Sequence, residues 1–144
     1  MNVTFCGHRY IKNPEKISQW LDLILPCLIE GGADTFYLGG YGAFDLLSAE
    51  AVKRQKAKYP HIQSILVLPY RNKQYDTSPY DHTFYPSLEA VPQHLAIIYR
   101  NEWMVSASDV VISGVQHAKG GAAKTLRCAK YQKKIIFQLP IHSG

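Results

Sequence analysis

The stretch that decides the fold is Thr35-Phe36-Tyr37-Leu38-Gly39-Gly40-Tyr41-Gly42-Ala43-Phe44-Asp45, in which a short apolar run leads into a glycine-rich turn. A helical pattern begins directly after the turn, so the glycines stand between a strand and a helix. Glycines at such a junction free the backbone amides to face an anion at the helix N-terminus. The spacing is close to the dinucleotide fingerprint, but Asp45 replaces its last glycine and the turn follows the second predicted strand. The stretch therefore predicts an α/β domain with a phosphate-binding turn.

Strand-like and helix-like segments alternate outward from this turn in both directions. The predicted strands are residues 3–6, 35–38, 64–68, 95–99, 110–115 and 135–139. The first predicted helix has Asn13 as its N-cap, is kinked at Pro26 and ends at Gly31-Gly32. The other predicted helices cover residues 43–58, 100–107 and 122–132. Several strands are continuous apolar runs, which is typical of a parallel sheet with helices on both faces. We therefore expect one Rossmann-like, doubly wound, mainly parallel α/β domain over residues 1–144, with a long polar and aromatic loop at 70–87.

Composition and charge narrow the class of protein. The chain has 144 residues, a net charge of +5 and no apolar segment long enough to span a bilayer, so we expect a soluble cytoplasmic protein. Basic residues gather at 53–58 and 119–134, which permits an anionic partner, although most are typical of solvated helix faces. Cys6, Cys27 and Cys128 form no close pair, so we predict neither a metal site nor a disulfide framework, and we expect buried apolar roles for the three thiols.

The residues that follow the predicted strands are the candidates for ligand binding, because ligands bind outside the carboxyl ends of parallel strands. Gly7-His8-Arg9 follows the first strand, and Lys119-Gly120-Gly121 precedes the last helix. The second turn differs from the phosphate loop of nucleoside triphosphatases, because alanines stand where that loop requires glycines. The candidate ligand-binding residues are Gly7, His8, Arg9, Gly39, Gly40, Gly42, Asp45, Tyr70, Arg100, Asn101, Gly120, Gly121, Ala122 and Lys124.

Three side chains are candidates for catalysis, although no full catalytic set can be identified. Asp45 could contact a ribose hydroxyl, act in catalysis or simply place favourable charge at a helix start. Glu50 could supply a carboxylate, but an ion pair with Arg54 one turn later is its simplest role. His8 could act as an acid or base from the first turn. We interpret Met104 as a core residue, and no Cys/His spacing predicts a metal site.

The ordered motifs resemble those of the SLOG superfamily, which joins the Smf/DprA proteins to the LOG phosphoribohydrolases, and most of all its small stand-alone YpsA-like bacterial branch. The resemblance runs from about Asn2 to Phe137 and rests on Phe5-Cys6-Gly7-His8-Arg9, residues 37–45, residues 100–105 and Gly120-Gly121-Ala122. It implies a Rossmann-like fold and a pocket for a nucleotide or nucleotide-derived ligand, such as ADP-ribose or a nucleoside monophosphate. It places glycines of the three turns, together with Arg9 and Asp45, around that ligand.

The chain departs from the LOG enzymes at their P-G-G-x-G-T-x-x-E motif. Lys119-Gly120-Gly121-Ala122-Ala123-Lys124-Thr125-Leu126-Arg127 is the corresponding stretch, and Arg127 stands where the catalytic glutamate would be. This departure speaks against LOG-type hydrolysis and leaves the phosphate-binding turn intact. Our first hypothesis is therefore binding or sensing of a phosphorylated nucleotide-like ligand, with no further cofactor implied. The alternatives are hydrolysis of an N-glycosidic or phosphoester bond by Asp45 or Glu50, and DprA-like nucleic-acid binding. Such domains often self-associate, but the sequence locates no interface.

Overall fold

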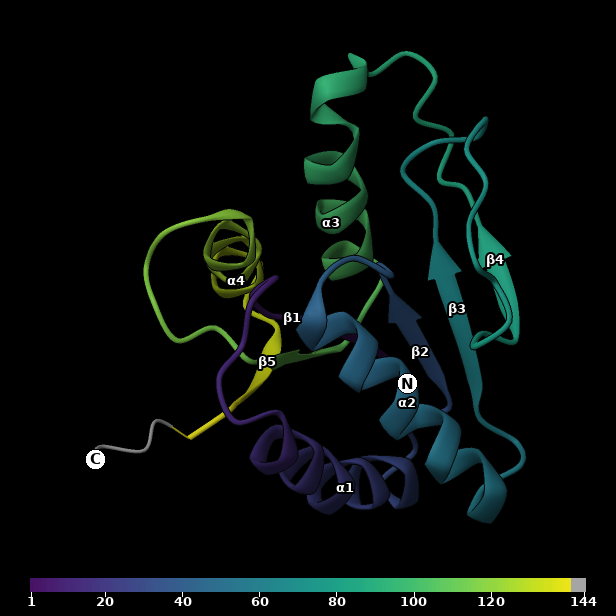
Figure 1. Cartoon of the computed structure of the whole chain (residues 1–144), viewed down its shortest axis with the longest axis vertical. Coiled ribbons are helices and arrows are strands. Elements are labelled where there is room, and N and C mark those ends of the chain that lie inside the picture. Colours follow the sequence, from purple (N-terminus) through teal and green to yellow (C-terminus); the bar gives the residue numbers. More distant parts are fainter. Residues whose placement is uncertain (141–144) are drawn as a thin grey trace.

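The computed structural model describes residues 1–140, and the sheet at its centre is parallel throughout (Figure 1). The strands are β1 (Asn2–Cys6), β2 (Thr35–Leu38), β3 (Gln63–Val67), β4 (His82–Phe84), β5 (Val110–Ser113) and β6 (Ile135–Gln138), in the spatial order β4-β3-β2-β1-β5-β6. The helices are α1 (Pro14–Glu30), α2 (Ala43–Lys58), α3 (Ala96–Ser106) and α4 (Gly121–Tyr131), with a 3-10 turn at Gln93–Leu95. The structure confirms the predicted Rossmann-like α/β class.

Helices cover the sheet on two sides, with α1 and α2 on one face and α3 and α4 on the other (Figure 1). The larger core cluster lies under α1 and α2, where Leu21, Leu25, Phe36 and Phe44 are fully buried. A smaller cluster under α3 and α4 is built around Val105 and residues of β5 and α4. Apolar side chains at helical spacing on one side of α1 explain why this segment is a helix that packs on the sheet.

The ends of α1 agree only in part with the sequence prediction. Gly31 and Gly32 end the helix as predicted, and Gly32 adopts a φ of +113°. Asn13 stands at the N-terminus, but its side chain forms no capping hydrogen bond, which corrects the predicted cap. Its left-handed backbone, with φ at 55°, instead turns its carbonyl oxygen toward the amides of Lys16 and Ile17. The helix continues through Pro26 to Glu30.

The predicted fourth strand is wrong, because residues 95–99 belong to the 3-10 turn and α3. A short apolar run fits a buried strand and a buried helix equally well. The helix prevails because Ala96, Arg100 and Met104, each four residues apart, all point into the protein. The fourth strand is instead β4, inside the predicted loop at 70–87, where three exposed residues pair with β3.

Two further predictions are corrected. Arg54 forms its ion pair with Asp22 of α1, at 2.9 Å, rather than with Glu50, so the contact ties α1 to α2. Of the three cysteines only Cys6 is buried, whereas Cys27 is exposed and Cys128 is half-buried. Within residues 1–140, no group of histidine, cysteine and acidic side chains could hold a metal ion. None of the helices in this part of the chain is both long and apolar enough to cross a membrane.

Candidate functional site

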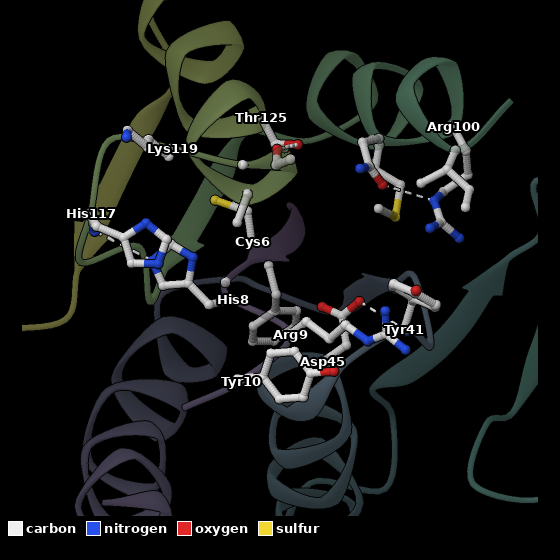
Figure 2. A pocket seen from close by; sticks show the side chains of 18 residues that line it. Cys6, His8, Arg9, Tyr10, Tyr41, Asp45, Arg100, His117, Lys119 and Thr125 are labelled. Atoms are coloured by element: carbon white, nitrogen blue, oxygen red, sulfur yellow. Dashed lines mark hydrogen bonds between the residues drawn. The ribbon is translucent and has the colours of Figure 1, made fainter. Parts of the chain in front are cut away.

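The candidate site is a cavity of about 340 Å³ at the point where the strand order reverses. β1 lies between β2 and β5, so the connections after β1 and β5 leave the sheet toward opposite faces. The cavity is lined by both of these connections, by the starts of α2 and α4 and by one face of α3 (Figure 2). This is the position at which doubly wound proteins bind their ligands.

The glycine-rich turn before α2 is closed by the protein itself. Ala43 and Phe44 donate their backbone amides to the carbonyl oxygens of Arg9 and His8, at 2.9 and 3.4 Å. The amide of Tyr41 donates to the carboxylate of Asp45 at 3.2 Å. These amides, which the sequence suggested for an anion, therefore already have acceptors within the chain. Gly42, with φ at +93°, allows this contact, because a Cβ atom would lie 2.8 Å from Cα of Arg9.

Two other glycines near the cavity serve packing rather than ligand approach. A Cβ atom added to Gly7 or to Gly114 would overlap the ring of Phe44. The ring is fully buried, so the backbones that follow β1 and β5 both lie directly against it. Phe44 thus joins the start of α2 to the two strands at the centre of the sheet.

The turn before α4 is open, in contrast to the turn before α2. Gly120 has φ at +95°, and Gly121 and Ala122 line the cavity. Within the described part of the chain, the amides of Gly121, Ala122 and Ala123 have no hydrogen-bond acceptor, and the first amide with a partner is that of Lys124. Unsatisfied amides at a helix N-terminus, with the positive end of the helix dipole, favour an anion.

Cationic and aromatic side chains border the cavity near this open turn. Lys119 lies directly before it, and Arg9 lies across the cavity on the turn after β1. The guanidinium of Arg9 stands 5.1 Å from the ring centre of Tyr41 and 5.5 Å from that of Tyr10. Both rings are exposed, so they offer flat surfaces beside a cation at the cavity mouth.

Arg100 reaches the same edge of the sheet from α3, but its guanidinium donates hydrogen bonds to backbone carbonyl oxygens. Its side chain is only 2% exposed, and its Nη1 donates to the carbonyl oxygens of Gly39 and Val67, both at 2.9 Å. Its Nε donates to the side chain of Asn101. Burial lowers the pKa of Arg100, and the charge of Asp45 acts in the opposite direction. Arg100 therefore ties the ends of β2 and β3 together beside the cavity.

Asp45 brings a carboxylate into this cationic surrounding. Burial raises the pKa of Asp45 to about 6, and the charge of Arg100 and the Tyr41 amide only partly offset it. Within residues 1–140, no ion pair includes Asp45. A half-buried carboxylate that is costly to ionise and lies in a cavity is typical of a functional site.

His8 contacts the segment that leads from β5 to α4. Its Nε2 accepts the backbone amides of Gln116 and His117, at 2.8 and 3.4 Å. The two imidazole rings stack with 3.7 Å between their centres. Burial lowers the pKa of His8, and the charge of His117 lowers it further. Because Nε2 is occupied by two amides, it is not free to exchange a proton with a ligand.

The structure brings most of the candidate ligand-binding residues to one cavity. Those that line it are Gly7, His8, Arg9, Asp45, Arg100, Asn101, Gly120, Gly121 and Ala122. Gly39, Gly40, Gly42, Tyr70, Lys124 and the catalytic candidate Glu50 lie outside the lining. The Tyr70 hydroxyl instead donates to the carbonyl oxygen of Gln93 at 3.0 Å.

Lys119, which begins the predicted glycine turn, also lines the cavity. Sequence reasoning missed the other lining residues: Phe5, Cys6, Tyr10, Tyr41, Ile97, Met104, His117 and Thr125. Helical spacing could have identified two of them, because Ile97 and Met104 share a face of α3 with Arg100 and Asn101. Met104 is also buried, as predicted. Thr125 lies one turn after Gly121 and donates its hydroxyl to the Gly121 carbonyl oxygen. No sequence pattern indicates that His117 lines the cavity, because its position depends on the stacked contact with His8.

The all-parallel sheet and the cavity at its reversal point define a Rossmann-like α/β protein. The chain is similar to DNA processing protein A from Helicobacter pylori, with a TM-score of 0.69 and 21% identity over 99% of this chain and 66% of that one. It is also similar to the molybdenum cofactor binding protein from Rippkaea orientalis, with a TM-score of 0.63 and 21% identity over 95% of this chain and 74% of that one. For the Moco carrier protein from Chlamydomonas reinhardtii, the TM-score is 0.59 and the identity 16%, over 96% of this chain and 75% of that one.

These similarities confirm the Rossmann-like α/β fold that the sequence predicted. The chain spans only about two thirds of the Helicobacter protein and half of the corresponding Streptococcus pneumoniae protein. No protein-family model matches the sequence, and no curated protein sequence matches it. At such low identities the likeness establishes the fold, and the function must be argued from the cavity.

Proposed function

We propose that the chain binds the phosphate group of a nucleotide or nucleotide-derived ligand in this cavity. The observation that carries the proposal is the open N-terminus of α4, whose first amides have no acceptor in the described residues and border the cavity at Gly121 and Ala122. Lys119 adds a cation next to these amides, and Arg9 adds a second across the cavity. Backbone donors, a helix dipole and cations together form a site for a phosphate.

The remainder of the ligand would lie toward the mouth and toward α3. A planar base would stack on Tyr41 or Tyr10 beside the Arg9 guanidinium. Asp45 would accept hydrogen bonds from hydroxyl or amino groups, as on a ribose. The similar solved proteins support a phosphorylated ligand, since single-stranded DNA and the molybdenum cofactor, named for them, both contain phosphate.

The decisive experiment removes one amide without removing the helix. Gly121 is the first residue of α4, where proline is tolerated, and a side chain there would meet no atom within 4 Å. We expect calorimetry with AMP, ADP-ribose, single-stranded oligonucleotides and pterin phosphates to find a ligand for the wild type. Gly121→Pro should lower the affinity for that ligand at least tenfold, a loss of about 1.4 kcal/mol in binding free energy. The thermal stability of the protein should not change.

A matched pair of lysines on the same helix and its lead-in provides the control. Lys119→Gln removes a cation at the cavity, whereas Lys130→Gln removes an exposed one from the last turn of α4. Only the first change should weaken binding. No binding of any member of the panel by the wild type, or equal effects of the two substitutions, would refute the proposed site.

Hydrolysis of the ligand is a second candidate function, and the raised pKa of Asp45 is the observation that favours it. A carboxyl that stays partly protonated near neutral pH can act as a general acid. Arg127, which stands where the LOG enzymes have their glutamate, donates instead to the Ala118 carbonyl oxygen at 3.2 Å. Release of free base from a bound nucleotide, abolished in Asp45→Asn, would establish turnover; a stable bound ligand would exclude it.

Nucleic-acid binding is the third candidate, and the similarity to DNA processing protein A supports it. Binding to a phosphate backbone falls steeply with salt, so mobility shifts at two salt concentrations separate it from binding of a small ligand. The YpsA-like branch, a single-domain chain, a cytoplasmic location and self-association stay predictions from the sequence.

A further inference from the structure

His8 connects the turn after β1 to the segment that leads into the open helix α4. Its Nε2 lies 2.8 Å from the amide of Gln116 and 3.4 Å from that of His117. The rings of His8 and His117 are nearly parallel, with 8° between their planes, and Figure 2 shows them together at the wall of the cavity. The contact thus spans two loops that are more than a hundred residues apart in the chain.

The hydrogen bonds assign the protonation state of this imidazole. A ring nitrogen that accepts a hydrogen bond carries no proton, so His8 is neutral and any ring proton is on Nδ1. Protonation of Nε2 would place an N–H group against two other N–H groups. It would also bring a positive charge against the face of His117. The protonated form therefore cannot keep this contact.

We propose that His8 is a positioning residue for ligand binding: its neutral imidazole holds residues 116–117, and through them the open amides of α4, and its protonation releases them. The inference rests on the proposed function and adds a pH dependence to the same site. His117 is followed by only three residues before Gly121, so a displacement at His117 changes where the turn before α4 lies.

The groups around His8 determine the direction and position of this effect. The titratable and charged groups that line the cavity with His8 are Arg9 and Tyr10 on its own connection, Tyr41 and Asp45 before and in α2, and His117 and Lys119 on the facing segment. Burial and then His117 lower the pKa of His8, so the contact persists below pH 6.5 and is lost on further acidification. Asp45 has the opposite effect on the affinity for an anion. Its carboxyl, with a pKa of about 6, is protonated as the pH falls, which removes a negative charge from the cavity.

The experiment uses sulfate as the probe, since it stays doubly charged throughout the range in which histidine and phosphate titrate. Binding is measured by nuclear magnetic resonance from the amides of Gly120 and Gly121, in an Asp45→Asn background that removes the opposing titration. We expect affinity to be constant between pH 7.5 and 6.5 and to be lost progressively on further acidification, because burial holds the pKa of His8 below 6.5 and binding requires its neutral form. In Asp45→Asn/His8→Gln the side-chain oxygen can still accept the amides but does not titrate, so binding should persist with a flat profile.

His117→Phe is the matched variant, because it keeps a flat ring against His8 and removes its charge. The fall in affinity should then begin at a higher pH, since His8 protonates more readily. Two results would overturn the inference. One is an affinity that rises on acidification, and the other is a His8→Gln variant whose affinity depends on pH in the same way as that of the Asp45→Asn parent. Its failure is distinguishable from that of the proposed site: absence of sulfate binding at every pH refutes the site, whereas the amide shifts of Gln116 and His117 on titration report the release without any ligand.

Discussion

Nη1 of Arg100 lies 2.9 Å from the carbonyl oxygen of Gly39, so a cation of α3 satisfies the backbone where β2 ends. The same nitrogen reaches the carbonyl oxygen of Val67 at the end of β3. Both acceptors stand at the carboxyl edge of the sheet, where no further strand residue can supply donors. Arg100 is therefore a structural part of the cavity wall.

Replacement of Arg100 should destabilise the protein strongly. Arg100→Met keeps the length of the side chain but leaves one buried and one half-buried carbonyl oxygen without this donor, which should lower the free energy of unfolding by about 2–4 kcal/mol. Urea denaturation measures this change. Arg71→Met is the control, because Arg71 pairs with Glu89 on the surface and should change stability by less than about 1 kcal/mol. Equal stability of the two variants would show that Arg100 is not needed for the fold.

The glycines against Phe44 lead to a second prediction. Gly7→Ala should lower the free energy of unfolding by about 1–3 kcal/mol, because the added methyl group overlaps the buried ring. Gly121→Ala, at the open turn, adds the same group where nothing lies within 4 Å and should be neutral or slightly stabilising. Denaturation of both variants tests the contrast. A Gly7→Ala protein as stable as Gly121→Ala would contradict the packing described for Phe44.

Much of this fold could be predicted from the sequence, because most of its strands are apolar runs and α1, α2 and α4 have glycine at a boundary. The edge strand β4 could not, since three exposed residues have no hydrophobic pattern and depend on pairing with β3. The sequence does not distinguish a strand from a helix at residues 95–99, because an apolar run alone does not reveal its period.

The site was harder to predict, because two similar glycine turns have opposite properties. The turn before α2 is closed by carbonyl oxygens of His8 and Arg9, whereas the turn before α4 is open. Those closing groups are backbone atoms more than thirty residues away, so no local motif distinguishes the two turns. The sequence also does not show that Gly7 makes room for a ring rather than for a ligand.

The anchoring of β4 supports a third prediction. Asp81, directly before β4, accepts the Ser64 amide at 2.9 Å and the ammonium group of Lys56 at 2.9 Å. Asp81→Ala should therefore raise hydrogen exchange at residues 82–84 while the central strands stay protected. Asp76→Ala is the control, since the hydrogen bonds of Asp76 among the described residues stay within the same loop, from the amide and hydroxyl of Ser78. Exchange in β4 that is unaffected by Asp81→Ala would show that pairing with β3 alone holds the strand.

The carboxylate of Asp45 should reduce stability at neutral pH, and the sign follows from its raised pKa. Below pH 3.8 the carboxyl is protonated in both the folded and the unfolded chain and imposes no penalty. Between pH 3.8 and about 6 the unfolded chain is ionised while the folded protein keeps the proton on this half-buried group, so stability falls across this window and the full penalty is present above it. Asp45→Asn should raise the free energy of unfolding by up to about 3 kcal/mol at pH 7.5, and the gain should vanish near pH 4. Asp22→Asn, which removes an exposed partner of Arg54, should change stability by less than about 1 kcal/mol at pH 7.5. If Asp45→Asn is less stable than the wild type at pH 7.5, the carboxylate stabilises the fold and the prediction is wrong. If the variant is more stable but binds the ligand more weakly, the carboxylate contributes to ligand binding and reduces stability.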